Sequence, residues 1–327
     1  MVSPQRRRYA RRVSPNPTYE DAVSHRIVAR DGTRIAWHDH GGHRPRAGHA
    51  TPVLLTNGLS TTDNFWRHLV TRLAPEHPLA HWQYRGHRPS DSAQSGDYSI
   101  ATHATDLAAV TEAFLDATHA EPRAAVHVAF SMGVTVLLEL YRQRPELVSA
   151  MVLIAGGASH PYASSSFFHV PGARSLVGTA LAAARPVVPR MQPLARRIMS
   201  SPWLFSAAQR VRALGREAPR DDLEHFFRAV GDMDLEAYWK TLESLLHARA
   251  DDVLPRIDVP VLVIAPESDV MALRADLEAL RQGIPGAEWL ELPGTSHAVL
   301  LEAGDTIAAR IDAFLASRVT KSSTLRS

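Results

Sequence analysis

Cysteine is absent from the 327-residue sequence. Its absence excludes disulfide bonds, thiolate nucleophiles and cysteine-based metal sites, and it agrees with a reducing cytoplasm, the location that we predict. Long hydrophobic runs are missing as well. The longest weakly polar stretch, residues 175–184, is shorter than the roughly 20 apolar residues that a transmembrane helix needs. No apolar segment follows the basic N-terminus, so we do not expect a secretory signal.

The sequence also carries almost no net charge. It has 36 Lys and Arg residues against 34 Asp and Glu residues, a formal balance of +2. So small an excess gives no reason to expect a nucleic-acid partner, and we interpret the basic segment RRRYARR as part of a solvated tail. The hydrophobic fraction of 45% is that of a globular protein with a sizeable core. The length allows one large core with an inserted subdomain, or two ordinary domains.

The first half of the chain shows a hairpin and then a regular alternation. Between the alternating runs HRIVAR and TRIAWHDH, Asp31-Gly32 suits a tight turn with positive φ at both central residues. From residue 52 to residue 157, short apolar runs alternate with helical patterns, the clearest of which is the amphipathic segment 102–119. This alternation predicts a parallel sheet with helices on both faces.

The alternation stops at residue 160 and resumes after Pro260. The residues between show helical stretches broken by prolines and no strand pattern, and a segment of this length needs hydrophobic contacts of its own. We therefore predict an α/β fold with a doubly wound, mostly parallel sheet of about eight strands and an inserted helical segment. The predicted parts are an N-terminal tail (1–22), a core in two pieces (23–159 and 250–317), the helical insert (160–249) and a C-terminal tail (318–327).

A serine occupies the junction between a buried strand and a helix in VHVAFSMGVTVLLEL. Ser131 has the small residues Ala129 and Gly133 two positions before and after it, as a sharp and strained turn between close elements requires. The start of the helix offers unpaired backbone N–H groups that can stabilise an oxyanion. The alternative interpretation is an ordinary serine that caps a helix.

The segment around Ser131 resembles the nucleophile elbow, G-x-S-x-G, of the α/β-hydrolase family, with Ala129 in place of the first glycine. The family's chain order of nucleophile, acid and histidine then points to two downstream loops. PVLVIAPESDVMA places Asp269 at the position of the acid, with Glu267 as a competing carboxylate. LPGTSHAVLLEAGD places His297 at the position of the general base.

Two further loops extend the resemblance. NGLSTTDNFW resembles the loop after the third strand, where relatives usually carry His-Gly and this chain has Asn57-Gly58. The resemblance implies that the backbone N–H groups of Leu59 and Met132 form the oxyanion hole. QYRGHRPSD is similar to the family's D-x-R-G-x-G-x-S loop, from which Gln83 and Arg88 depart, and its implied role is structural, with Arg85 and Gly86 shaping a tight turn.

The inserted segment resembles the helical cap that many relatives place after the sixth strand. We expect most of its aromatic side chains to form the core of the cap and the rest to line an apolar pocket, which would suit a small-molecule acyl or aromatic substrate. The aromatic candidates are Phe167, Phe168, Trp203, Phe205, Phe226, Phe227, Tyr238 and Trp239.

The resemblance implies hydrolysis of a carboxylic ester or lactone through an acyl-enzyme on Ser131, with no metal and no organic cofactor. Thioester or carbon–carbon hydrolysis, acyl transfer, cofactor-free haloperoxidase activity and a non-catalytic binding role stay open as alternatives. A histidine-rich tract, His38, His40, His43 and His49, could suggest a metal site. It offers no carboxylate cage beyond Asp39, so we do not predict one. The oligomeric state is not indicated.

Overall fold

The protein's structure is a computed structural model that describes residues 22–41, 51–120, 123–159, 179, 183, 186–210, 214–215 and 218–319. The predicted tails, apart from residue 22 and residues 318–319, lie outside these ranges. So do most of the stretch 175–184 and the residues from 160 to 178. No helix in the described part of the chain combines the length and the hydropathy that a bilayer crossing requires.

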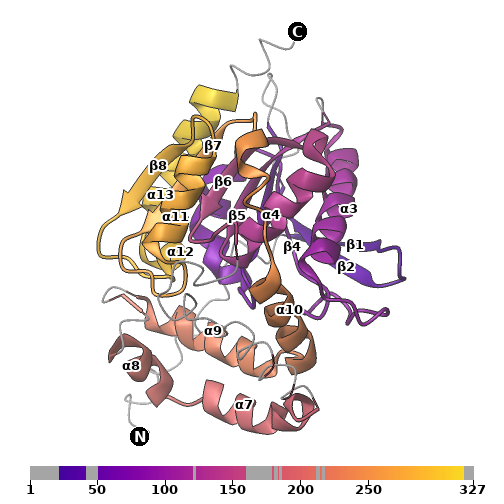
Figure 1. Ribbon diagram of the computed structural model, residues 1–327, viewed down its shortest axis with the longest axis vertical. Coiled ribbons are helices and arrows are strands. Elements are labelled where there is room, and N and C mark those ends of the chain that lie inside the picture. The colour runs from indigo at the N-terminus through magenta and orange to yellow at the C-terminus, as the bar shows by residue number, and fades with distance from the viewer. Residues whose placement is uncertain are drawn as a thin grey trace, which may run out of the picture.

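The centre of the molecule is an eight-stranded sheet with the strand order β1-β2-β4-β3-β5-β6-β7-β8 (Figure 1). β2 pairs antiparallel with β1 and with β4, and every other neighbouring pair is parallel. The predicted fold, a mostly parallel sheet of about eight strands, is therefore confirmed. The strands are β1 (Val23–Val28), β2 (Arg34–Asp39), β3 (Val53–Thr56), β4 (Leu79–Trp82), β5 (Ala125–Phe130), β6 (Val148–Ile154), β7 (Val261–Pro266) and β8 (Glu288–Leu292).

Helices cover both faces of the sheet because its central strands are buried on both sides. All six residues of β5 are buried, and along β6 and β7 successive side chains enter opposite hydrophobic clusters. One face carries α3 (Ile100–Thr118), α4 (Met132–Gln143), the 3₁₀ turns η3 (Pro145–Leu147) and η5 (Leu254–Arg256), and α11 (Arg274–Gly283). The other carries η2 (Asp63–Trp66), α2 (Arg67–Leu73), α12 (Val299–Glu302), α13 (Gly304–Phe314) and the π-helical turn η6 (Leu315–Val319).

The amphipathic pattern of α3 is confirmed in detail. Four of the apolar residues that give the segment its pattern are fully buried: Leu107, Val110, Phe114 and Leu115. The helix begins at Ser99, whose hydroxyl accepts a hydrogen bond from the backbone N–H of Thr102 at 3.2 Å. This 19-residue helix covers part of one face of the sheet, and the candidate serine follows a strand of the same sheet.

The predicted hairpin forms, but its turn differs from the expected one. β1 and β2 are joined by the five residues 29–33, in which Gly32 alone has a positive φ, of 86°. The expectation of a positive φ at Asp31 is wrong because that side chain has another role in a longer loop. Its carboxylate accepts hydrogen bonds from the backbone N–H of Thr33 at 3.1 Å and from Arg85 at 2.9 Å.

Between β6 and β7 the chain forms a group of helices below the sheet in Figure 1. Ser159 and Arg249 form an isolated antiparallel bridge, and the N–H of Ala250 donates to the carbonyl of Ala158 at 2.8 Å. The chain therefore leaves the core and re-enters it at one point. The helical elements described here are η4 (Val188–Met191), α7 (Gln192–Met199), α8 (Trp203–Arg210), α9 (Arg220–Asp232) and α10 (Leu235–His247).

Candidate active site

Ser131 joins β5 to α4 in a backbone conformation that side-chain-bearing residues rarely adopt, with φ 54° and ψ −122°. Its N–H donates to the carbonyl of Ile154 at 2.9 Å. A Cβ at Gly133 would approach the carbonyl oxygens of Thr56 and Asn57 to 2.7 Å. The end of β3 passes directly beside the turn, and for this reason the residue two positions after the serine must be small.

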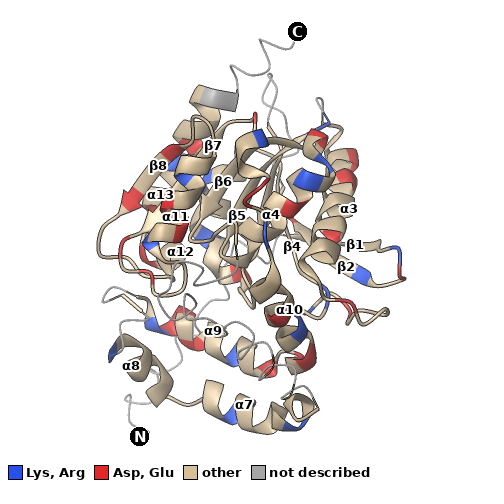
Figure 2. Cartoon of the chain, in the orientation of Figure 1, with Lys and Arg blue, Asp and Glu red and all other residues tan. Residues whose placement is uncertain are grey.

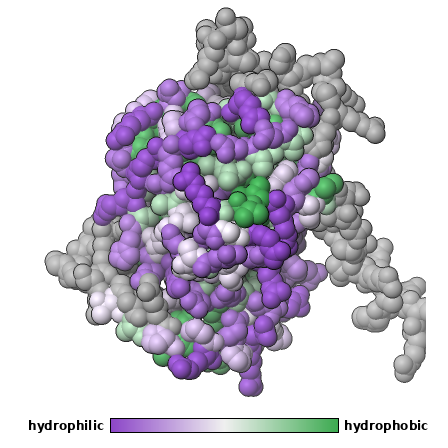
Figure 3. Space-filling view, turned by 90° about the vertical axis from the view of Figure 1, so that its right-hand side faces the viewer, coloured by the Kyte–Doolittle hydropathy of each residue, from purple (hydrophilic) through white to green (hydrophobic). Residues whose placement is uncertain are grey.

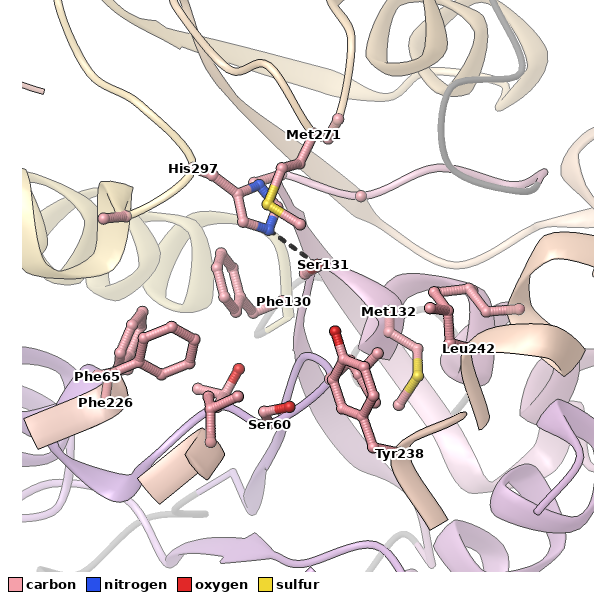
Figure 4. Close-up of a pocket in the computed structure, with 18 of the residues that line it drawn as sticks. Ser60, Phe65, Phe130, Ser131, Met132, Phe226, Tyr238, Leu242, Met271 and His297 are labelled. Atoms are coloured by element: carbon pink, nitrogen blue, oxygen red, sulfur yellow. Dashed lines mark hydrogen bonds between the residues drawn. The ribbon is translucent and has the colours of Figure 1, made fainter. Parts of the chain in front are cut away.

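The three side chains singled out in the sequence meet in one line. Nε2 of His297 lies 3.0 Å from Oγ of Ser131 (Figure 4). Nδ1 of the same ring lies 2.7 Å from Oδ2 of Asp269. The Asp269 side chain is fully buried and that of His297 is 15% exposed. The structure thus brings together residues that are 166 and 28 positions apart in the chain.

The second oxygen of Asp269 is held by the backbone. Oδ1 accepts hydrogen bonds from the N–H groups of Met271 at 2.7 Å and Ala272 at 2.9 Å, which leaves Oδ2 aimed at the imidazole. Glu267, the competing carboxylate, instead accepts a hydrogen bond from the N–H of Gly294 at 2.7 Å. Of the two candidates, Asp269 is therefore the one that contacts His297.

Glu302 supports the histidine loop, a role that sequence reasoning missed. Its Oε2 accepts from the N–H of Ser296 and its Oε1 from the Ser296 hydroxyl, both at 2.6 Å. Oε1 also accepts from the N–H of Gly215, in the helical insert, at 2.9 Å. One carboxylate thus joins the residue before His297 to the insert. The motif E-A-G-D after the histidine was visible, but nothing in it indicates these donors.

The loop after β3 lies against the serine. A Cβ at Gly58 would be 2.9 Å from Cβ of Ser131, so the backbone here approaches the candidate nucleophile as closely as packing permits. Leu59 and Met132 both line the pocket that contains Ser131. Met132 is the first residue of α4, a position whose N–H has no acceptor within the helix. These placements are compatible with the predicted oxyanion donors.

Asn57, which replaces the family's usual histidine, is the centre of a buried hydrogen-bond network. Its Oδ1 accepts from Nε1 of Trp66 at 2.6 Å, and its Nδ2 donates to Oε1 of Gln83 at 3.1 Å and to the carbonyl of Trp82 at 2.9 Å. The hydroxyl of Tyr84 donates to the Asn57 carbonyl at 2.6 Å. Two departures from the family pattern, Asn57 and Gln83, are therefore partners of each other.

Arg85 has the structural role that the resemblance implies. Its guanidinium donates to both oxygens of Asp106 at 2.7 Å and to Asp31 at 2.9 Å, and the side chain is 2% exposed. Gly86 has φ 77°, and a Cβ there would lie 2.3 Å from Cβ of Ala237 in α10. The turn is thus fixed by a buried ion pair and packs against the insert.

The histidine tract forms part of the sheet edge. His38 stacks on His81 with ring centroids 4.8 Å apart, and Nε2 of His40 lies 2.8 Å from Nδ1 of His81. Burial lowers the pKa of His38 to about 4. His43 and His49 lie outside the described residues, and within the described ranges no group of three or more His, Asp and Glu side chains is placed to hold a metal ion.

A pocket of about 730 Å³ opens above Ser131, between the core and the helical insert. Figure 4 shows Phe65 and Phe226 on one side of it, Tyr238 and Leu242 on the other, and Ser131 between them. Its described lining is mostly apolar and includes no Lys or Arg; besides the phenol of Tyr238, its ionisable side chains are Asp276 and His297. Met199, Leu204, Leu223, Val230, Leu245 and Leu246 also contribute from the insert.

The expected division of the aromatic residues of the insert is only partly right. Phe226, Phe227 and Tyr238 line the pocket, whereas Phe205 is buried beneath the guanidinium of Arg220. Trp203 belongs to neither group, because it is 58% exposed. Phe167 and Phe168 lie outside the described residues.

Comparison with known proteins agrees with this fold. The model of the alpha/beta hydrolase family matches residues 53–310. A protein of Klebsiella pneumoniae (strain 342), provisionally named as the carbamate hydrolase RutD, is 25% identical over 264 residues, which cover 79% of this chain and 88% of that protein.

Solved structures extend the likeness in three dimensions. The enol-lactonase from Burkholderia xenovorans LB400 superposes with a TM-score of 0.65 at 21% identity and covers 90% of this chain and 100% of its own. The esterase EaEST from Exiguobacterium antarcticum superposes with a TM-score of 0.66 at 20% identity over 89% of this chain and 99% of its own. At these identities the superpositions establish the shared fold.

Proposed function

Because the chain belongs to the alpha/beta hydrolase family, we propose that it is a serine hydrolase that cleaves a carboxylic ester or lactone through an acyl-enzyme on Ser131. The observation that carries this proposal is the hydrogen-bonded line from Ser131 through His297 to Asp269, with separations of 3.0 and 2.7 Å. A serine hydroxyl is a weak nucleophile until a base takes its proton, and this line supplies the base and orients it.

In the proposed reaction, Oγ of Ser131 attacks the substrate carbonyl while Nε2 of His297 takes the hydroxyl proton. The imidazolium then gives that proton to the leaving alcohol as the carbon–oxygen bond breaks and the acyl-enzyme forms. A water molecule then loses a proton to the same nitrogen and attacks the acyl carbonyl; the bond between that carbon and Oγ of Ser131 breaks, the imidazolium returns the proton to Oγ, and the acid is released. Asp269 fixes the ring so that Nδ1–H faces the carboxylate throughout, which its two backbone hydrogen bonds support.

The N–H groups of Leu59 and Met132 would hold the oxyanion of the tetrahedral intermediates. Preorganised donors of this kind accelerate acyl transfer by about 10²–10³-fold each, because they need no reorientation when the charge develops. The close packing of Gly58 against Ser131 and the position of Met132 at the start of α4 support this assignment.

The pocket favours a neutral substrate with a sizeable apolar acyl part. The cavity of about 730 Å³ has a mostly apolar described lining, so binding is favoured when hydrocarbon is buried in it. The described lining residues offer no cation to an anionic substrate. The RutD relative is named for a carbamate, and a free carbamate ion would find no positive partner among the described lining residues of this pocket. We therefore place the substrate among apolar esters and lactones.

We also propose that residues 160–249 act as a cap over this pocket. The bridge between Ser159 and Arg249 and the pocket residues supplied by α9 and α10 support this division of the chain. A cap of this kind excludes water from the acyl-enzyme and selects the substrate by size.

An active-site probe tests the catalytic proposal directly. We expect a fluorophosphonate to label the wild-type protein with one-to-one stoichiometry and to fail to label Ser131→Ala, measured by intact-mass spectrometry on protein shown to be folded by circular dichroism. Folded wild-type protein that stays unlabelled would favour the alternative of a binding protein without turnover. A screen of p-nitrophenyl esters of graded length, with lactones and thioesters beside them, then separates the remaining chemistries.

A further inference from the structure

The helical insert exposes apolar side chains where a surface helix normally exposes polar ones. Val187, Met191, Leu194 and Ile198, in and beside η4 and α7, are 39–50% exposed. Their spacings of four, three and four residues keep them on one side of the helical run. Trp203, at the start of α8, is 58% exposed. We call these five residues the apolar stripe.

The opposite side of α7 is the one that packs against the protein. Gln192 donates to the carbonyl of Gly231 at 2.8 Å, and Arg196 pairs with Asp232 at 2.6 Å. A Cβ at Gly231 would lie 3.0 Å from Cβ of Met199, which shows how closely α7 and α9 approach. Gln192 and Met199 therefore lie on the side of α7 that meets α9, and the apolar stripe lies on the outward side, where a helix that only covers a core would carry polar residues.

The charged residues of the segment that carries the apolar stripe all have one sign, and the neighbouring Asp232 of α9 is paired with one of them, Arg196. Residues 186–210 include four arginines and no Asp or Glu. Arg190 and Arg197 are exposed and flank the stripe, and Figure 2 shows basic but no acidic positions on α7 and α8. Figure 3 shows apolar surface among polar residues at the lower end of the molecule, where Figure 1 places α7. An outward apolar stripe bordered by arginines, with a tryptophan beside it, fits an anionic lipid surface.

We propose that the face formed by η4, α7 and the start of α8 docks on anionic lipid. The apolar stripe enters the boundary between headgroups and acyl chains, and Arg190 and Arg197 contact lipid phosphates. The same helices reach the pocket from their other side, since Met199 and Leu204 line it next to the exposed Ile198 and Trp203. Docking here places the roof of the pocket against the lipid, so that apolar molecules dissolved in the bilayer enter close to Ser131.

Vesicle cosedimentation of the full-length protein tests this proposal without any turnover. We expect the protein to bind phosphatidylcholine vesicles that contain phosphatidylglycerol roughly thirtyfold more tightly than vesicles of phosphatidylcholine alone, because two arginines near an anionic surface contribute about that factor. The binding to the anionic vesicles should weaken as salt is added. The double variant Leu194→Glu/Ile198→Glu should lose binding to both. The double variant Arg190→Gln/Arg197→Gln should lose the preference for the anionic vesicles.

The matched control is Val28→Glu, which places the same charge on another exposed apolar side chain, 71% exposed on β1, and should bind like wild type. Thermal unfolding by circular dichroism verifies that each variant is folded. Wild-type protein that ignores anionic vesicles, or a stripe variant that still binds them, overturns the proposal. A third result would also overturn it: wild-type protein that does not bind lipid but is a dimer by sedimentation equilibrium, with the dimer lost in Leu194→Glu/Ile198→Glu. The apolar stripe would then be an interface between two copies of the chain. Fluorophosphonate labelling is independent of all these outcomes, so failure of the docking proposal is distinguishable from failure of the proposed hydrolase.

Discussion

At the scale of single residues, the two carboxylates of the acid loop have different partners, and their variants should therefore differ. Asp269→Asn should lower kcat by about 10³–10⁴-fold, because an amide at this position favours the wrong imidazole tautomer. Glu267→Gln is the matched control and should keep most of the activity, since Glu267 contacts the N–H of Gly294 instead. Steady-state hydrolysis of a p-nitrophenyl ester measures both. Equal losses in the two variants would contradict the assignment of Asp269.

The hydrogen bond between Asn57 and Trp66 leads to a second prediction at the scale of single residues. Asn57→Ala leaves Nε1 of the fully buried Trp66 without its acceptor, and an orphaned buried donor costs about 1–3 kcal/mol of stability. Trp66→Phe removes that donor, so the double variant should be less destabilised than the sum of the two single variants. Urea unfolding of all four proteins gives the coupling. Strict additivity would mean that this hydrogen bond contributes nothing of its own.

The sequence was sufficient to predict which three side chains of the candidate site lie together. Ser131 follows from small neighbours at a junction of strand and helix, and Asp269 and His297 follow from their places in the family's chain order. The supporting contacts could not be read in the same way. That Asn57 and Gln83 replace two family residues was visible, but that they are hydrogen-bonded to each other depends on how β3 and β4 lie side by side.

At the scale of elements, Glu302 in α12 connects the histidine loop to the insert. Glu302→Ala should lower the rate of fluorophosphonate labelling by about tenfold or more, because a small displacement of His297, the proposed base, would be costly. Glu302→Gln keeps one acceptor oxygen, so its labelling rate should lie between those of wild type and Glu302→Ala. Arg310, whose ion pair with Glu288 lies elsewhere on the same face, provides a control in Arg310→Gln that should label like wild type. Labelling of Glu302→Ala at the wild-type rate would show that the loop is held by other contacts.

Elements were predicted best where one pattern repeats along a segment. The strands and α3 match their sequence signals because a strand buried on two faces leaves a short continuous apolar run and a helix buried on one side leaves a helical periodicity. The turn between β1 and β2 was predicted less well, since the Asp31 carboxylate is recruited by Arg85 from a distant loop. α7 was harder still, because its apolar residues Leu194 and Ile198 are exposed while Gln192 packs against α9.

At the scale of the whole molecule, the fold could be predicted because the order of elements alone restricts the topology. A run of strand–helix units with one helical interruption leaves few arrangements other than a doubly wound sheet with an insert. The pocket could not be predicted in this way, since its shape depends on how α9 and α10 lie over the carboxyl ends of the strands. The apolar residues of the insert were visible, but which of them line the pocket, fill the interior or face solvent is decided by packing.

The whole molecule should also lose stability in mild acid, because it buries neutral histidines. Burial lowers the pKa of His87 and of His127 to about 4, and that of His103 also lies well below its usual range. In the unfolded chain these rings take up protons near their ordinary pKa of about 6.5. The unfolded state therefore binds more protons between pH 6.5 and 4, so this stability is complete above that window and declines as the pH falls through it.

His127 provides the sharpest test of this linkage. A ring with a folded pKa of about 4 should contribute about 2 kcal/mol to the difference in unfolding free energy between pH 7.5 and pH 5. His127→Gln, which can still donate to the Leu147 carbonyl, should reduce that difference by this amount even if it lowers stability at both pH values. His247→Gln, at an exposed position at the end of α10, should leave the difference unchanged. Urea unfolding at the two pH values measures the effect, and an unaltered difference in His127→Gln would mean that this ring is protonated equally in the folded and unfolded chains.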